Sequence, residues 1–530
     1  MGPVVEVPVA EGLSRPAPVR WVKVLDQSRC IGCHACTTAC KSENSVPVGV
    51  TRTYVKSVEV GKYPQVRRNF QVTRCNQCSD APCVAACPTE AMYQRPDGIV
   101  DFDKSICIGC KACMAACPYD AIFINPEDHS AEKCNFCAHR LEVGLEPACV
   151  SVCPTEAILV GDLNDPASKV SRIVQREAVS VRRPEKETRP GLYYKGAHQA
   201  TLDPLGARRP DGGLFAWATQ GGPHDPQLVS AGHPSGHNSS AAALISYDVP
   251  HHAPWGWRVS LYTWTKGLAS GTLAVAVVLG YVGLLKFNGV VLGYVAPSVA
   301  LGSLGATGAL LIWDLKHPER FYLIFTRHHW RSWLVRGSFV IAFYGLSASA
   351  FLLIAVLVGA AGLPVAAAGK AAQVVGALVL AGAVGTACYT AFLFAQAKAR
   401  DLWQSPLLPP QLAVQAALVG AAALLVAVRL SAGLGPATTA TEAVLAVAAG
   451  LHLLFVAGEV TLAHPTAHAH LAVAEMTRGR YAWFFWLGTA CTAVSVSAVW
   501  AGVAAVPFAL IGVLAYEHSY VQAAQSVPLA

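Results

Sequence analysis

Long apolar runs alternate with short polar stretches throughout the second half of the chain. Each run beyond Trp255 has about 20 residues, the length that an α-helix needs to cross a bilayer. Small residues fill many runs, as in GSLGATGA at 302–309, and they allow close helix packing in lipid. The pattern predicts eight membrane-spanning helices, near 261–285, 290–313, 335–358, 371–396, 411–430, 441–463, 482–500 and 503–521. Seven helices is the chief alternative, because only residues 502–507 separate the last two runs.

The first part of the chain has no such runs. NFQVTR at 69–74, GIVDFD at 98–103 and AIFIN at 121–125 alternate and predict short β-strands. Residues 197–254 are rich in Gly, Pro, Ser and His without periodicity, which indicates a linker over the surface. We expect solvated side chains rather than metal ligands for the irregularly spaced His198, His224, His233, His237, His251 and His252. The predicted organisation is an arm, an α+β domain, a linker and an all-α polytopic membrane bundle, at 1–22, 23–196, 197–254 and 255–530.

Cysteine supplies the chemistry of the first part. The stretch CIGCKACMAAC at 107–117, followed by Pro118, places three thiols where they can face one metal cube and a fourth that points toward a second cluster. This run is typical of ferredoxins that hold 4Fe-4S clusters, and it recurs three more times. Sixteen of the 18 cysteines form these motifs, which predict four clusters. The motifs are Cys30, Cys33, Cys36 and Cys40; Cys75, Cys78, Cys83 and Cys87; Cys107, Cys110, Cys113 and Cys117; and Cys134, Cys137, Cys149 and Cys153.

Other uses of these cysteines fit the spacing less well. A structural zinc site would take its thiolates as two separated pairs, and a disulfide framework would not pack three cysteines into seven residues. The remaining two, Cys388 and Cys491, lie inside apolar runs, where we expect them to be small packing residues.

The composition averages the two parts. A hydrophobic fraction of 53% with 14% charged residues is that of a membrane protein combined with a soluble domain. The formal net charge of +7 does not indicate nucleic-acid binding, because the basic residues lie mostly at the ends of apolar runs. The first residues show neither a Sec nor a twin-arginine signal, so we expect the cysteine-rich part in a reducing compartment.

Both parts resemble known families. Residues 23–196 are similar to the four-cluster iron–sulfur subunits of the dimethyl sulfoxide reductase family, through the four cysteine motifs and the segments GDLNDP and RPGLYY. Residues 255–530 resemble the NrfD family, the membrane subunit of polysulfide reductase and related complexes. That resemblance rests on WDLKHPERF at 313–321, YTAFLFAQAKARDLWQSPLLP at 389–409 and YVQAAQSVPL at 520–529.

The resemblance implies a ligand pairing that the spacing alone leaves open. Motifs one and four would exchange their last cysteines, and so would motifs two and three. The four ligand sets would be Cys30, Cys33, Cys36 with Cys153; Cys134, Cys137, Cys149 with Cys40; Cys75, Cys78, Cys83 with Cys117; and Cys107, Cys110, Cys113 with Cys87.

The resemblance also implies a redox role. In these families a wire of clusters joins a catalytic subunit, with molybdenum or tungsten in a bis-pterin (molybdopterin) cofactor, to a quinone such as menaquinone in the membrane. This sequence shows neither a pterin-binding domain nor a CxxCH haem motif, so we expect the substrate chemistry on another polypeptide. A nickel-iron hydrogenase is an alternative partner, and a redox-driven proton pump or transporter subunit is an alternative function.

Ionisable residues of the membrane part gather at the helix ends on the side of the iron–sulfur domain. Charges inside a bilayer are costly, so such residues are functional candidates. We expect a quinone site formed by Lys266, Asp314, His317, Glu459 and, by resemblance to the family's quinone-contacting tyrosine, Tyr389. His452 lies seven residues before Glu459 on the same helix face and could extend a proton path inward. Asp314 could instead pair with Lys316 or Arg320 to hold its loop.

Basic residues predict the orientation. Eleven lie near helix ends on the side of the iron–sulfur domain and three on the other side. The positive-inside rule then places the iron–sulfur domain on the cytoplasmic face of a prokaryotic membrane.

Overall fold

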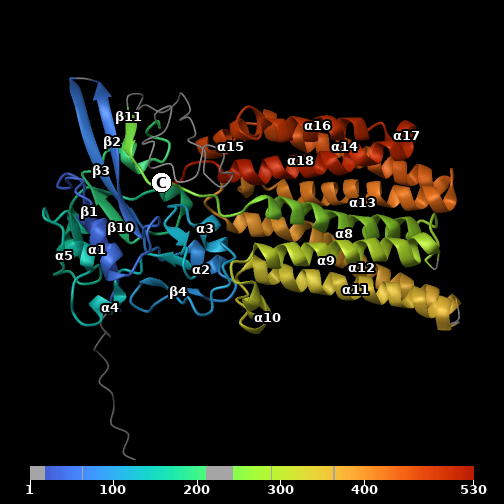
Figure 1. Cartoon of the computed structure of the whole chain (residues 1–530), viewed down its shortest axis with the longest axis horizontal. Coiled ribbons are helices and arrows are strands. Elements are labelled where there is room, and N and C mark those ends of the chain that lie inside the picture. The colour runs from blue at the N-terminus through green and yellow to red at the C-terminus, as the bar shows by residue number, and fades with distance from the viewer. Residues whose placement is uncertain (1–17, 63, 210–242, 288, 362–364) are drawn as a thin grey trace, which may run out of the picture.

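The computed structural model describes residues 18–62, 64–209, 243–287, 289–361 and 365–530. Figure 1 shows two parts end to end along the long axis. One is a head of strands and short helices, residues 18–209 and 243–256, and the other is a tail of long helices, residues 257–530. The predicted fold class, an α+β domain followed by a helical bundle, is confirmed.

The described residues of the head form four small sheets. The strands are β1 (Trp21–Asp26), β2 (Thr53–Lys62), β3 (Gln65–Arg74), β4 (Met92–Gln94), β5 (Val100–Phe102), β6 (Ile122–Ile124), β7 (Ala131–Lys133), β8 (Ile158–Asp162), β9 (Val179–Ser180), β10 (Leu192–Lys195) and β11 (Ala243–Tyr247). The sheet orders are β8-β1-β10-β9, β11-β2-β3, β4-β5 and β6-β7, with β1 and β10 parallel. The three segments predicted as strands contain β6, β5 and the end of β3, so these predictions are confirmed.

Short helices follow the cysteine loops. The head helices are α1 (Ala35–Glu43), α2 (Pro82–Ala86), α3 (Ala112–Ala116), α4 (Ala138–Leu141), α5 (Ala148–Ser151), α6 (Lys169–Arg176) and α7 (Gln199–Leu202). In Figure 1, α2 and α3 lie toward the tail, while α1, α4 and α5 lie at the opposite end of the head.

The structure differs from the expected surface linker at both of its ends. Residues 199–202 form the buried helix α7, and β11 pairs with β2 inside the head. His251 is not solvated either, because its ring lies between the carboxylates of Asp120 and Asp248. The predicted arm, residues 1–22, also differs from the structure at its C-terminal end, because Trp21 and Val22 already belong to β1. Residues 1–17 and 210–242, with His224, His233 and His237, lie outside the described residues.

The tail helices agree with the predicted apolar runs. They are α8 (Trp257–Tyr281), α9 (Ala296–Asp314), α10 (Leu323–Thr326), α11 (Trp333–Ala361), α12 (Val365–Gln396), α13 (Leu408–Ala432), α14 (Pro436–Thr461), α15 (Ala467–Thr477), α16 (Ala482–Ser495), α17 (Ala498–Ala501) and α18 (Val506–Gln525). In the described part of the chain, six spans are long and apolar enough to cross a membrane. The other two predicted runs correspond to α8, which carries more polar residues, and to α16, which has 14 residues. Gly502, with φ of 57°, lies in the turn that separates the last two runs, so they form two helices rather than one.

Close packing of small residues holds the centre of the tail together. A Cβ atom on Gly271 of α8 would lie 1.7 Å from the carbonyl oxygen of Ala416 on α13, so only glycine permits this crossing. The same contact requires Gly420 on α13. Such crossings bring backbones together where lipid offers no hydrophobic driving force for helix association.

Polar contacts fix the head to the tail. The guanidinium of Arg320, just after α9, donates to the carbonyl oxygens of Lys104 and Cys107, at 2.9 and 3.0 Å. Ser332 donates to the carbonyl oxygen of Ala86 on α2 at 2.9 Å. Because several such bonds reach the cysteine loops directly, the head has a defined position over the ends of the tail helices.

Candidate redox site

The cysteine loops owe their shape to residues with positive φ. Gly109 and Lys111 have φ of 66° and 63° on either side of Cys110, and Gly32 and His34 have 69° and 60° around Cys33. Left-handed residues turn the chain sharply, and glycine adopts this conformation at little cost. These two loops therefore turn sharply at their second cysteine before a short helix begins.

Electrostatic interactions between thiols cross from one motif to another, as the pairing implied by the resemblance requires. Charge interactions join Cys30 and Cys36 with Cys153, and Cys40 with Cys134, Cys137 and Cys149. They also join Cys78 and Cys83 with Cys75 and Cys117, and Cys110 and Cys113 with Cys107 and Cys87. Cys36 also interacts with Cys149, and Cys113 with Cys83, across the expected ligand sets, so the ligand pairing stays a prediction.

The donor set fits cubane clusters better than single ions. Among the described residues, no three His, Cys, Asp or Glu side chains converge closely enough to hold one metal ion. A zinc ion at about 2.3 Å from each sulfur would draw its four ligands together, whereas a cube holds its thiolates apart at four corners. Backbone N–H groups of Met92, Ala131 and Ala157 donate to cysteine sulfurs at 3.2 to 3.4 Å, which favours the thiolate form.

Arginine and lysine supply further positive charge between the groups. Arg74 donates to the sulfur of Cys149 at 3.0 Å, and Lys23 lies 3.8 Å from the same atom. Burial by itself raises the pKa of the Cys149 thiol, but these two cations outweigh it and lower the pKa to about 7. This cysteine is therefore prepared to bind as a thiolate.

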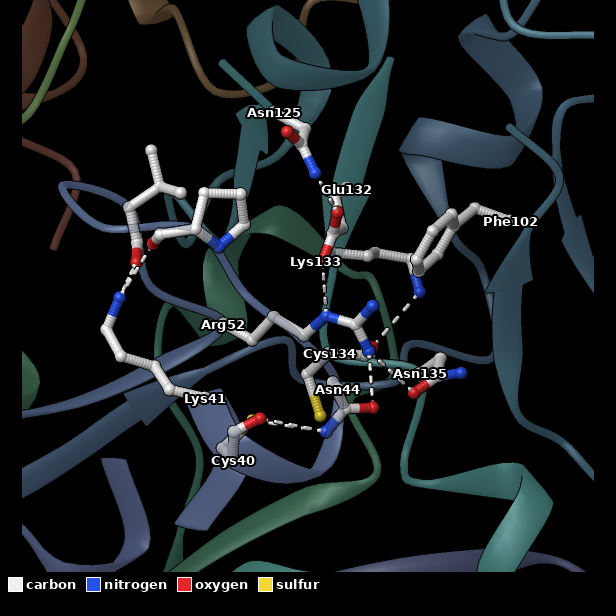
Figure 2. Close-up of polar contacts among 12 residues, drawn as sticks. Cys40, Lys41, Asn44, Arg52, Phe102, Asn125, Glu132, Lys133, Cys134 and Asn135 are labelled. Carbon is white, nitrogen blue, oxygen red and sulfur yellow. Dashed lines mark hydrogen bonds and ion pairs between the residues drawn. The ribbon is translucent and has the colours of Figure 1, made fainter. Parts of the chain in front are cut away.

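A second arginine joins motifs one and four. Figure 2 shows Arg52 between Glu132 on one side and Asn44 and Asn135 on the other, with contacts of 2.7, 2.7 and 3.1 Å. The amide of Asn44 donates to the carbonyl oxygen of Cys40 at 3.1 Å and lies 3.7 Å from its sulfur. The buried Arg52 thus holds Asn44 beside the thiol of Cys40. In the expected pairing, Cys40 completes the ligand set of motif four.

A cavity of about 300 Å³ lies against the group that contains Cys110. It is bounded by α8, α9, α11 and α12, and most of its lining is apolar, with polar atoms from Asp314, Ser338, Tyr262 and Tyr389. Trp255 also lines it and donates from Nε1 to the carbonyl oxygen of Cys110 at 3.1 Å. A flat, mostly apolar molecule with a few polar atoms fits such a space.

The structure brings three of the expected site residues together. Tyr389 and Asp314 line the cavity, and Lys266 lies with its ammonium 5.0 Å from the centre of the Tyr389 ring. Lys266 also donates to the hydroxyl of Thr390 at 2.7 Å. Asp314 pairs with Lys111 at 2.9 Å, not with Lys316 or Arg320, so its carboxylate joins the cavity to a cysteine loop.

The other expected residues lie elsewhere. His317 faces the head, where its Nε2 contacts the carbonyl oxygen of Asp128 at 2.8 Å. Glu459 and His452 are buried on α14, away from the lining of the cavity. Sequence reasoning missed Trp255 and Tyr262, which resemble ordinary aromatics at the start of a membrane helix. It also missed Lys111, although a lysine between two cluster cysteines was a visible signal.

Fold and site together define an iron–sulfur electron-transfer protein joined to a membrane domain. The 4Fe-4S dicluster domain matches residues 66–163, the 4Fe-4S binding domain matches 21–42, and polysulphide reductase, NrfD, matches 247–515, half of the chain. The chain belongs to the NrfD family, and it is a fusion of this membrane anchor with an iron–sulfur subunit of the dimethyl sulfoxide reductase family. It is an integral membrane protein.

Curated relatives match the head. A tetrathionate reductase subunit of Salmonella typhimurium is 45% identical over 193 residues, which are 36% of this chain and 77% of that protein. Protein NrfC of Escherichia coli is 43% identical over 178 residues, 33% of this chain and 80% of that protein. A putative dimethyl sulfoxide reductase iron-sulfur subunit of Halobacterium salinarum is 36% identical over 201 residues, 32% of this chain and 77% of that protein.

Proposed function

We propose that this chain carries electrons between a separate catalytic subunit and a membrane quinone. The observation that carries the proposal is the apolar cavity whose lining includes both Cys110 and Tyr389. A quinone ring in this cavity would lie beside a cluster ligand, and its oxygens would have Tyr389 and Asp314 within the same lining. Quinones are the lipid-soluble redox carriers of membranes, so a mostly apolar cavity among the tail helices suits their chemistry.

Four 4Fe-4S clusters would supply the one-electron chemistry of the wire. Their ligands would be the 16 motif cysteines in the four expected ligand sets, all within residues 23–196. Support comes from the interactions between thiols of different motifs, from the backbone N–H groups that point at sulfur, and from the two 4Fe-4S domains that match the head. The tail, residues 255–530, would act as anchor and quinone site.

The opposite end of the head would receive the catalytic subunit. Cys33 is exposed, and five large apolar side chains near α1, α4 and α5 are exposed with it: Ile31, Val48, Val143, Leu145 and Val152. Exposed apolar side chains around a cluster favour docking of a redox partner. The relatives are subunits of tetrathionate and dimethyl sulfoxide reductases, which supports a partner with a molybdopterin cofactor.

The cytoplasmic side is proposed for the head. Basic residues on the head side of the tail include Arg327, Arg331, Arg478 and Arg480, and few lie on the other side. The positive-inside rule supports this orientation in a prokaryotic membrane. Protease added to sealed inside-out vesicles is expected to degrade the head, and complete protection would reverse the assignment.

The experiment that tests the function is electron paramagnetic resonance of the purified complex with added menadiol. Reduced 4Fe-4S signals are expected on adding the quinol, and their loss on adding menadione. Clusters that dithionite reduces but menadiol never does would refute the quinone link. Metal analysis of the co-purified partner is expected to show molybdenum or tungsten. Nickel in its place would indicate that the partner is a hydrogenase.

A further inference from the structure

Buried polar residues continue from the cavity into the other half of the tail. Lys266, Glu517, His452 and Glu459 are 1%, 5%, 1% and 9% exposed. Among the described residues, none of the four forms an ion pair within 4 Å. Titratable side chains in such positions are costly and are seldom kept without a function.

The first step leads from the cavity to α18. Lys266, beside Tyr389, lies one turn after Thr263 on α8 and on the same face of that helix. The hydroxyl of Thr263 donates to the carboxylate of Glu517 on α18 at 2.9 Å. Lys266, beside the cavity tyrosine, is therefore one helical turn from the residue that contacts the buried carboxylate of Glu517.

The second step crosses α18 toward α14. Tyr516 is the neighbour of Glu517 on α18; its ring meets that of His452 edge-on at 4.8 Å, and its hydroxyl accepts a bond from Gln411 at 2.8 Å. Glu459 lies two turns after His452 on the same face of α14, and both residues are buried. Neither ring nitrogen of His452 has a hydrogen-bond partner in the described part of the chain. Buried polar groups of this kind are commonly satisfied by internal water, which also conducts protons.

This polar band reaches the head-side end of α14. Glu459 lies two residues before the end of α14 on that side. Toward the other side, the turns of α14 before His452 place Leu445, Ala448 and Ala449 in the apolar core of the tail. An apolar plug therefore separates the band from Glu442, the next buried carboxylate along α14.

We propose that the band from Lys266 through Glu517 and Tyr516 to Glu459 exchanges the protons of the quinone with the aqueous phase on the head side. The inference rests on the proposed quinone function. Oxidation of one quinol gives one quinone, two electrons that reduce two clusters by one electron each, and two protons that leave through the band. Reduction of a quinone runs the same balance in reverse. Electrons and protons would use the same side of the membrane, so turnover would move no net charge across it.

The test uses the full chain with its clusters and follows cluster reduction by menadiol in stopped-flow absorbance. Glu517→Gln and Glu459→Gln are expected to slow this reduction about tenfold or more, since positioned proton carriers contribute at least that much. Reduction by dithionite, which delivers electrons without quinol, should stay unchanged. A small weak acid such as acetate should restore part of the rate in Glu517→Gln, which a purely structural defect would not allow.

Glu442→Gln is the matched control, because it removes a buried carboxylate from the same helix beyond the apolar plug. Its rate should equal that of the unaltered chain. Equal rates in Glu517→Gln, Glu459→Gln and the unaltered chain would overturn the relay while leaving the quinone function intact. Failure of menadiol to reduce clusters in the unaltered chain would overturn both. In proteoliposomes, a membrane potential generated during turnover would also overturn the proposed relay. Release of protons on the side opposite the head would overturn it as well.

Discussion

Two nearly identical cysteine loops lie at opposite ends of the head and meet different surroundings. CIGCHACTTAC at 30–40 faces outward, and CIGCKACMAAC at 107–117 faces the tail. Ile31 is 57% exposed, whereas its counterpart Ile108 is 1% exposed. Ala115 and Ala116 pack against tail residues, at places where the first loop has the more exposed Thr38 and Ala39. The backbone of the loop is the same, so the surface around it decides where electrons enter or leave.

The residue directly after the second cysteine of each loop shows the same difference. His34 and Lys111 share a left-handed backbone. His34 stacks edge-on against Tyr247 of the head at 4.8 Å, while Lys111 pairs with Asp314 of the tail. His34 thus packs within the head, whereas Lys111 connects the head to a residue that lines the cavity.

The largest expected effect comes from replacing one of two thiols, the half-buried Cys110 or the exposed Cys33. Cys110→Ser should abolish reduction of all clusters by menadiol, a loss of about a hundredfold or more, because the ligand nearest the cavity is lost. Cys33→Ser should leave reduction by menadiol intact and block delivery to the catalytic subunit. Resonance spectra and iron content measure both, and Cys491→Ser is the control. Equal effects of the two variants on menadiol reduction would contradict the assignment of the Cys110 end of the head to the quinone and of the Cys33 end to the catalytic subunit.

The isoleucines compare the two surroundings directly. Ile108→Asp should lower the stability of the head–tail contact by about 3 kcal/mol or more, because it buries a charge without a partner. Ile31→Asp should change stability by less than about 0.5 kcal/mol, as exposed substitutions do. Thermal unfolding in detergent measures both. A similar loss in each would show that the first loop is also covered in the folded chain.

Tyr389→Phe tests the cavity with its shape preserved. Loss of the hydroxyl should slow menadiol oxidation about tenfold, since a hydrogen-bonding group in contact with the reacting molecule contributes about 1.4 kcal/mol. Dithionite reduction should be unaffected. An unchanged rate with menadiol would place the reacting oxygens elsewhere in the cavity.

A pH-dependent effect on stability is expected in the segment just before α8. Burial lowers the pKa of His251, but the carboxylates of Asp248 and Asp120 outweigh burial and raise it to about 9. This raised pKa contributes stability that is fully present below about pH 6.5 and is lost as pH rises through about 9. His251→Gln should therefore cost about 2 kcal/mol at pH 6 and little at pH 9.5. The exposed neighbour variant His252→Gln should show no such dependence in the same unfolding experiment.

The cysteine loops could be predicted from sequence, whereas the contacts between head and tail could not. Motif spacing is local, so the 16 thiols and the strands after them follow from short stretches of chain. Asp314 and Lys111 lie 203 positions apart, and nothing in either segment indicates the pair that joins them. The helix ends placed Glu459 and Asp314 on one side of the membrane, but only packing shows that Asp314 reaches the cavity and Glu459 does not. The linker prediction failed for a similar reason, because β11 is recognised by its pairing with β2 rather than by its composition.

Filling the cavity is the most direct test of the central claim. Gly308 of α9 lines the cavity, and a Cβ atom there would meet no other atom within 4 Å. Gly305, on the same helix, is equally open but does not line the cavity. Freeze-quenched resonance spectra after mixing with menadiol should show reduced clusters in the unaltered chain and in Gly305→Trp, and none in Gly308→Trp, although dithionite reduces all three. Rapid reduction by menadiol in Gly308→Trp would contradict the account.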